Sequence, residues 1–214
     1  LKVSKRKKIT DSENITLPSS TAKDNVSKNN TTISLDEDFS EINVKREASF
    51  TGHFKEEEQS EKLEFYDFVY EDYEKYGTKP LLELVKNAKR KAQYSKEFEA
   101  LVNKQKEAQK ENYKKTLSSE FGFEIDDHNL KIKSTGRFGS NMPMAYEESF
   151  KIKNHLIKKA GQNYMIEIGQ FLTSQAEIDK KDKERTNNVY MAFPRSFENE
   201  ITFEIPAGYA VSGI

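Results

Sequence analysis

Residues that perform acid–base or metal chemistry are thinly spread along this chain. The histidines are His53, His128 and His155, which lie in three different segments, and no two share a helix at metal-ligand spacing. The densest cluster is Asp126-Asp127-His128, but adjacent residues of a turn or strand rarely converge on one ion. We therefore interpret the cluster as a polar hairpin turn, and His53, which follows a glycine, as a strand-end residue. The sequence predicts no metal ligand.

Nucleophilic chemistry has even less support. The chain contains no cysteine, which excludes a Cys-His-Asp site, structural disulfides and cysteine metal sites within it. No serine stands in a Gly-x-Ser-x-Gly motif, and Gly139-Ser140-Asn141 is a turn signal. Gly136-Arg137-Phe138-Gly139 lacks the Lys-Ser/Thr pair of a phosphate-binding loop. The sequence does not exclude a pair of catalytic carboxylates of the glycosidase type, because its 36 acidic residues allow many pairings. We predict a non-enzymatic chain with no catalytic residue, cofactor-binding residue or cofactor.

Two other polar motifs have local explanations. Asp36-Glu37-Asp38 lacks the glycine and the later glutamate of a calcium loop, so we expect a solvated hairpin turn. Asn-x-Ser/Thr sequons begin at Asn14, Asn25, Asn29 and Asn30. They would be glycan acceptors in a secreted eukaryotic protein, but turn chemistry is favoured, since Asn, Ser and Thr side chains hydrogen-bond to nearby backbone.

The elements that position these residues must come from a polar chain. It has 214 residues, 35 basic and 36 acidic, 33% of residues charged and a mean hydropathy of -0.89. Fourteen Phe and ten Tyr supply the large buried areas of a core. No run approaches 18 apolar residues, so no membrane span is predicted. The basic start, Leu1 to Lys8, lacks the apolar stretch of a signal peptide, and we expect targeting information to lie outside this sequence.

Hydrophobic periodicity predicts an α+β fold. Period-two alternation predicts strands at 31–35 and 42–50, and apolar residues at three- and four-residue spacing predict a helix at 57–76 that ends at Gly77. A second helical tract spans 81–108, with a break at Tyr94-Ser95 as one option. Further strands are predicted at 121–125, 130–132, 150–152, 164–172, 189–193 and 201–205.

These elements predict an antiparallel β-sheet, with a sandwich as one arrangement, and an inserted helical hairpin. The segments are 1–56 (leading loop and strands), 57–118 (helical) and 119–214 (antiparallel β), in one fragment of a larger protein. The predicted core consists of Phe50, Val69, Tyr73, Leu101, Ile132, Phe150, Ile166, Ile168, Met191, Phe203 and Ile205.

The two helical tracts carry opposite charges. Residues 55–76 hold nine acids and three bases, whereas residues 79–115 hold eleven bases and five acids. The basic tract alone would suit a nucleic-acid or lipid surface. We favour mutual neutralisation of adjacent helices and predict no nucleic-acid binding. The acids expected near the basic tract are Glu61, Glu64, Asp67, Glu71 and Glu74.

The carboxyl-terminal stretch from Val189 to Tyr209, including Pro206-Ala207-Gly208-Tyr209, resembles the final β-domain of a family of exported bacterial proteins. Three further segments fit the same domain: Thr31 to Lys55, Met142 to Phe150 and Tyr164 to Gln175. Members of the family, common in Bacteroidetes-type bacteria, have an amino-terminal domain of unknown function, a transglutaminase-like core and a β-rich tail.

The resemblance implies that this chain is a non-catalytic structural or interaction module following a transglutaminase-like core. It implies a periplasmic, outer-membrane-associated or extracellular location, and neighbouring domains of the same chain as partners. The alternative is a carbohydrate- or peptide-binding accessory domain, with a protein or polysaccharide ligand. A concave groove with exposed aromatic residues would favour the binding domain. Near-complete burial of the aromatic residues would favour the structural module.

Overall fold

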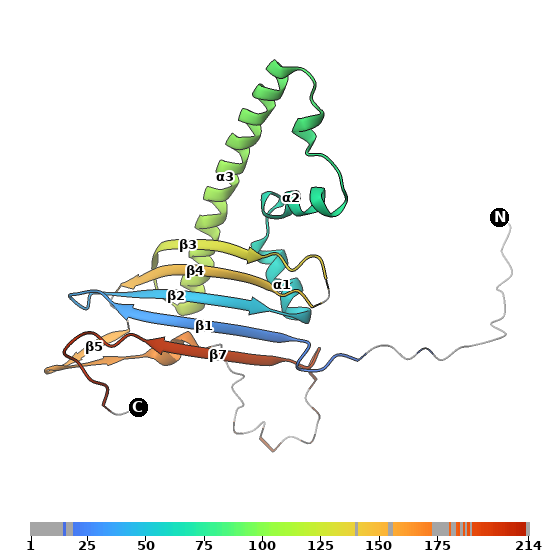
Figure 1. The fold of residues 1–214 in the computed structure, drawn as a ribbon. Helices are drawn as coiled ribbons and strands as arrows, with labels where there is room; N and C mark the ends of the chain where they lie inside the picture. Colours follow the sequence, from blue (N-terminus) through green and yellow to red (C-terminus); the bar gives the residue numbers. More distant parts are fainter. Residues whose placement is uncertain are drawn as a thin grey trace, which may run out of the picture.

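The structure of the chain is a computed structural model that describes residues 19–139, 141–153, 156–172 and 190–212, and the single residues 15, 180, 183, 184, 186 and 188. Its main element is a five-stranded sheet in the order β3-β4-β2-β1-β7. The strands are β1 (Val26–Leu35), β2 (Glu41–Phe50), β3 (Ile125–Ser134), β4 (Met144–Lys153) and β7 (Ser196–Phe203). Figure 1 shows this sheet as one layer, from which a long helix projects. The α+β fold class is confirmed.

Alternation of apolar and polar residues builds the sheet. In β2, Val44 and Phe50 face the covered side, while Lys45 and Glu47 between them are exposed on the other. The predicted hairpin turn between β1 and β2 is confirmed: Asp36 accepts hydrogen bonds from the Ser40 hydroxyl at 2.7 Å and the Glu41 amide at 2.8 Å. One face of the sheet is therefore covered by other elements, and the other is more exposed and polar.

The strand β7 departs from the predicted antiparallel pattern. It pairs with β1 in parallel, from Val26 beside Ser196 to Ile33 beside Phe203, whereas the other pairs of the sheet are antiparallel. A second, two-stranded sheet joins β5 (Ile157–Ala160) to β6 (Asn163–Ile166). Its residues join the same apolar core as the large sheet, so it extends the covered side rather than forming the second layer of a sandwich.

The predicted helix at 57–76 is two helices. Helix α1 (Gly52–Lys62) and helix α2 (Phe65–Lys75) are separated at Leu63, and α2 starts with a capping box in which Glu64 and Asp67 bond each other's backbone amides. The predicted stop at Gly77 is confirmed by its φ of 60°.

The second helical tract is longer and starts later than predicted. A short 3-10 helix, η1 (Leu81–Leu84), precedes the single 34-residue helix α3 (Ala88–Phe121), which Asn87 caps through its side chain. The helix continues through Tyr94, so the break considered there is absent. It also includes Phe121, which was predicted to start a strand, and ends at Gly122 with a φ of 71°.

A β-bulge replaces the predicted turn at Asp126 to Asn129. These residues lie inside β3, where the pairing with β4 shifts register between Asp126 and Asn129. Asp127 has a φ of 50°, which is unusual for a non-glycine residue. The extra residue changes the face of the sheet to which the following side chains point, so His128 is buried on the covered face.

The asparagines of the sequons also differ from the prediction. Asn29 and Asn30 are strand residues within β1, not turn residues. Asn25 does belong to local turn chemistry: its buried side-chain amide donates to the Thr21 carbonyl at 3.1 Å and accepts from the His53 amide at 3.0 Å. Asn14 lies outside the described residues.

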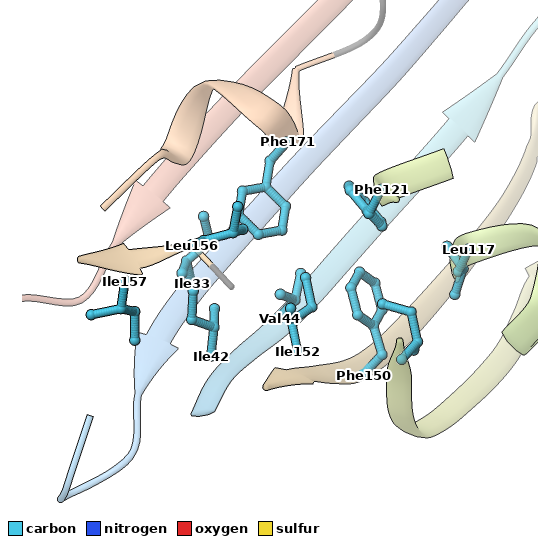
Figure 2. Close-up of a cluster of buried hydrophobic side chains, with 11 residues drawn as sticks. Ile33, Ile42, Val44, Leu117, Phe121, Phe150, Ile152, Leu156, Ile157 and Phe171 are labelled. Atoms are coloured by element: carbon cyan, nitrogen blue, oxygen red, sulfur yellow. The ribbon is translucent and has the colours of Figure 1, made fainter. Parts of the chain in front are cut away.

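The core lies between the covered sheet face, the end of α3 and the 3-10 helix η2 (Ile168–Phe171). Figure 2 shows Leu117 and Phe121 of α3 facing Phe150 and Val44 of the sheet, with Phe171 beside them. Phe121 lies 5.5 Å from Phe150 and 5.4 Å from Phe171, ring centre to ring centre. These contacts attach one end of α3 to the sheet.

The predicted core list is correct only in part. Phe50, Val69 and Phe150 are buried, whereas Tyr73, Ile132, Ile166 and Phe203 are half-buried. Four others are exposed: Leu101, Ile168, Met191 and Ile205. Leu101 lies on the projecting part of α3 and Ile168 begins η2, while Met191 and Ile205 fall outside β7.

Candidate functional site

A groove of about 990 Å³ opens on the covered face of the sheet, between α1, α3 and η2. We call it the sheet groove. Its lining residues come from four strands, two α-helices and η2: Ser27, Asn29, Arg46, Phe50, Glu58, Glu61, Lys62, Thr116, Glu120, Phe121, Tyr146, Gly169, Gln170, Phe171, Leu172 and Asn199. Most of these side chains are polar, so the groove differs from an ordinary gap in an apolar core.

A buried charge network lies under the sheet groove. The guanidinium of Arg46 in β2 donates from Nε to Glu148 Oε1 at 2.5 Å, and from Nη1 to Glu120 Oε1 on α3 at 2.8 Å. The other oxygen of Glu148 accepts from His128 Nε2 at 3.3 Å. The network thus links β2, β4 and β3 of the sheet to the last turn of α3.

Pairing outweighs burial in setting the charges of this network. Burial opposes ionisation of Glu148, but the nearby Arg46 guanidinium and the hydrogen bond from His128 lower its pKa overall. Burial likewise opposes the charge of Arg46, but Glu148 and Glu120 raise its pKa. Both groups are therefore ionised at neutral pH, and each charge is stabilised by the other.

Glu58 on α1 has the opposite balance. Burial raises its pKa, and the attraction of Lys62 only partly offsets this effect. Its Oε2 atom is buried and makes no hydrogen bond, and the Lys62 Nζ atom lies 3.6 Å away. Lys62 also lies over two aromatic rings, 5.3 Å from the centre of Tyr113 and 5.2 Å from that of Tyr146. The folded protein thus disfavours the charged form of the Glu58 carboxyl group, and Lys62 compensates for this only in part.

We predict that Glu58→Gln stabilises the protein at neutral pH. A carboxyl group whose pKa is raised on folding favours the folded state at low pH, and this contribution is lost as pH rises through the raised pKa. Removing the carboxylate should therefore increase the free energy of unfolding at about pH 7, and the gain should vanish below the ordinary glutamate pKa of about 4.3. Urea unfolding at several pH values measures this, with exposed Glu57→Gln as the control. A loss of stability at neutral pH would contradict the assignment.

The break between α1 and α2 holds Glu58 and Lys62 in place. At that break the Tyr113 hydroxyl donates to the Lys62 carbonyl at 2.7 Å, and the Gln109 amide donates to the same carbonyl at 3.1 Å. The Tyr66 hydroxyl donates to Gln109 Oε1 at 2.6 Å, and burial raises the pKa of Tyr66 to about 12. Residues of α3 thus satisfy the free carbonyl at the end of α1 and fix the wall of the groove.

The structure separates the residues of the Asp126-Asp127-His128 cluster. Asp126 pairs with Lys114 and Lys153, and Asp127 pairs with Lys151. Only His128 points into the covered side. Within the described part of the chain, no group of three His, Asp or Glu side chains is arranged to hold a metal ion.

The other two histidines do not join this network. His53 lies in the first turn of α1, rather than at a strand end as predicted, and its ring stacks on Phe193 at 4.6 Å. His155 and Ser140 lie outside the described residues.

Sequence reasoning missed Arg46 and Glu148, although a signal was available. Each occupies an inward position in a strand of alternating residues, and the two are direct partners in the β2–β4 register. An inward-facing base in one strand and an inward-facing acid in another indicate a buried pair, because neither charge is tolerated alone.

The acids of α2 find partners other than the basic helix. Asp72 pairs with Arg137, whose guanidinium also lies 4.0 Å from the centre of the Phe68 ring, and Glu71 accepts from the Thr135 hydroxyl at 2.5 Å. Among the described residues, no ion pair joins an acid of 55–76 to a base of 79–115. Of the predicted neutralisation between the acidic and basic tracts, the described residues show the attraction between Lys106 and Asp67. The Lys106 Nζ atom also lies 5.3 Å from the centre of the Tyr66 ring.

Within the described residues, no helix is both long and apolar enough to cross a membrane. Comparison of the chain with family models, curated proteins and solved structures finds no match. The resemblance to exported transglutaminase-like proteins therefore stays a prediction from the sequence.

Proposed function

We propose that this chain is a non-catalytic interaction module, and that its protein-contact surface is the helical arch formed by α2, η1 and residues 88–108 of α3. One observation carries the proposal. Of the 34 residues of α3, only Tyr113, Leu117 and Phe121 are buried, all near its carboxyl end. Helices in proteins owe most of their stability to packing of an apolar face, so a long helix projecting without such packing is suited to contact another molecule.

The surface chemistry of the arch supports a protein partner. Large apolar side chains are exposed along it: Phe65, Tyr70, Tyr76, Leu81, Leu84, Tyr94 and Leu101. Residues 86–96 add five bases and no acid. Clustered exposed apolar side chains mark interaction surfaces, and the charge favours a partner with an acidic rim. Figure 1 shows η1 and the amino-terminal part of α3 standing away from the sheet, whereas α2 lies beside it.

We propose a neighbouring domain of the same, longer chain as the partner. The family resemblance supports this choice, because it places a transglutaminase-like core before the β-rich tail. On this proposal the parent is an exported bacterial protein, located in the periplasm, at the outer membrane or outside the cell. The buried pair Arg46–Glu148 under the sheet groove supports a non-catalytic role, since each of these two groups is engaged with the other.

The proposal is tested with the full-length open reading frame. The remainder of its product is expressed separately, and its binding to this chain is measured by calorimetry. We expect Leu101→Glu on the arch to weaken binding by on the order of tenfold or more. Met165→Glu, at a similarly exposed apolar site on β6, is the control and should bind normally. Absence of binding, or binding that Leu101→Glu leaves unchanged, would exclude the arch as the contact surface.

A nucleic acid is the other partner that a basic helix suits, and we expect none to bind. Titration with labelled single- and double-stranded oligonucleotides at about 150 mM salt tests this. Binding at micromolar concentration that weakens steeply with salt, and that Lys89→Glu reduces, would replace the protein partner by a nucleic acid.

A further inference from the structure

We infer that the sheet groove is a binding site for a short, neutral oligosaccharide. This inference goes beyond the proposed contact surface, because no residue of the arch lines the groove. It rests on three properties of the lining residues: neutral hydrogen-bonding groups, carboxylates that outnumber two cations already engaged by other side chains, and rigid apolar walls.

The floor of the groove presents neutral donors and acceptors. Asn29 of β1 and Asn199 of β7 are direct neighbours in the parallel register, and Ser27 precedes Asn29 on the same face. Thr116 on α3 and Gln170 on η2 add a hydroxyl and an amide from the walls. The Thr116 hydroxyl donates to the Asn112 carbonyl at 3.1 Å, and the Gln170 amide donates to Glu167 at 3.2 Å. The Asn29 amide donates to the Ser27 hydroxyl at 3.5 Å, so these side chains offer a ligand mainly their acceptor oxygens. Amide and hydroxyl groups both donate and accept, as sugar hydroxyls do. Such a set matches a ligand with many neutral hydroxyl groups.

The charged lining residues disfavour an anionic ligand. The carboxylates of Glu58, Glu61 and Glu120 outnumber the cations Arg46 and Lys62. Arg46 already donates to two carboxylates, and Lys62 is held by Glu58 and two aromatic rings. A phosphate or acidic sugar would meet net negative charge. Carboxylates accept strong hydrogen bonds from hydroxyl groups, so they suit a neutral saccharide.

The apolar walls are fixed before a ligand arrives. Phe50, Phe121 and Phe171 line the groove but are themselves mostly buried in the core, so their positions are set by packing. Leu172 adds an exposed apolar surface at the rim. Sugar rings carry apolar C–H faces beside their hydroxyl groups, and a preformed wall reduces the entropy lost on binding.

A peptide fits this groove less well than a saccharide. Extended peptides are commonly bound by strand addition, which needs unpaired backbone groups at a sheet edge. Of the strands that line the groove, β1, β2 and β4 are each paired on both sides within the five-stranded sheet, and only β7 lies at its edge. The backbone groups of β1, β2 and β4 are therefore already used, and these strands offer only side chains to a ligand.

Titration of the whole chain with three neutral tetrasaccharides tests the inference by isothermal calorimetry and NMR. The probes are cellotetraose, maltotetraose and the tetramer of N-acetylglucosamine, with tetragalacturonate as the acidic comparison. We expect at least one neutral probe to bind and the acidic one to bind more weakly. Thr116→Trp, which places a large side chain at the exposed rim, should weaken that binding by on the order of tenfold or more. Lys115→Trp, beside it on α3 but outside the groove, should leave binding unchanged.

Two results would overturn the inference. One is failure of all three neutral probes to bind. The other is binding that Thr116→Trp does not affect while both Trp variants unfold at the wild-type temperature. Preferential binding of an extended lysine-rich peptide would replace the saccharide by a peptide. Leu101→Glu on the arch should leave saccharide binding intact, so failure here is distinguishable from failure of the proposed protein contact.

Discussion

Replacing Arg46 by Met is expected to lower the free energy of unfolding by about 3–5 kcal/mol, the cost of leaving one partner of a buried ion pair unpaired. The Glu148 side chain is only 3% exposed, so water cannot replace the lost guanidinium. The connection from Glu120 of α3 to the sheet is lost as well. Urea unfolding at about pH 7 measures the effect. Lys28→Met is the control, because the exposed pair Lys28–Glu198 contributes at most about 1 kcal/mol.

Two further measurements identify the cause of that loss. A lowered pKa means that Glu148 stabilises the fold at neutral pH, and that this contribution is lost as pH falls through the lowered pKa. The loss in free energy of unfolding caused by Arg46→Met should therefore become smaller as the pH falls. Adding Glu148→Gln to Arg46→Met should recover part of the stability, since the unpaired charge is then gone. Additive losses in the double variant would show that the two side chains do not act as a pair.

Phe150→Ala is the second change expected to have a large effect, costing about 3–5 kcal/mol for the lost ring and the cavity it leaves. Phe150 is 2% exposed and contacts the core beside Phe121, where α3 meets the sheet. Ile205→Ala is the matched control: it was also predicted to be buried, but Ile205 is 51% exposed. We expect that change to cost under about 0.5 kcal/mol. Equal losses in the free energy of unfolding for the two variants, measured by urea unfolding, would contradict the burial of Phe150 and the exposure of Ile205.

The strands were predictable because burial of one face imposes alternation. Val44, Phe50 and Phe150 follow this rule, and the fold class follows from the order of the elements. The helix stop at Gly77 was also predictable, since a left-handed residue after a helix favours glycine. These features depend on the local sequence and on which side of each strand or helix is buried.

The remaining features depend on contacts between distant segments. The bulge at Asp127 is a property of the β3–β4 pairing, whereas the polar run there has the sequence pattern of a turn. Leu101 has the spacing of a core residue, but an amphipathic pattern does not specify what covers the helix. The sheet groove combines α1, α3, η2 and four strands, and no local pattern specifies such an arrangement.

The pairing of β1 with β7 has a consequence for how the chain folds. The paired residues Val26 and Ser196 are about 170 positions apart, so this contact forms only after β7 has been synthesised, and such long-range contacts slow folding. Until then β1 is an exposed edge strand carrying a row of unpaired backbone groups, which can pair with another chain. A nascent or truncated chain that lacks β7 is therefore expected to be more prone to aggregation than the chain that includes it.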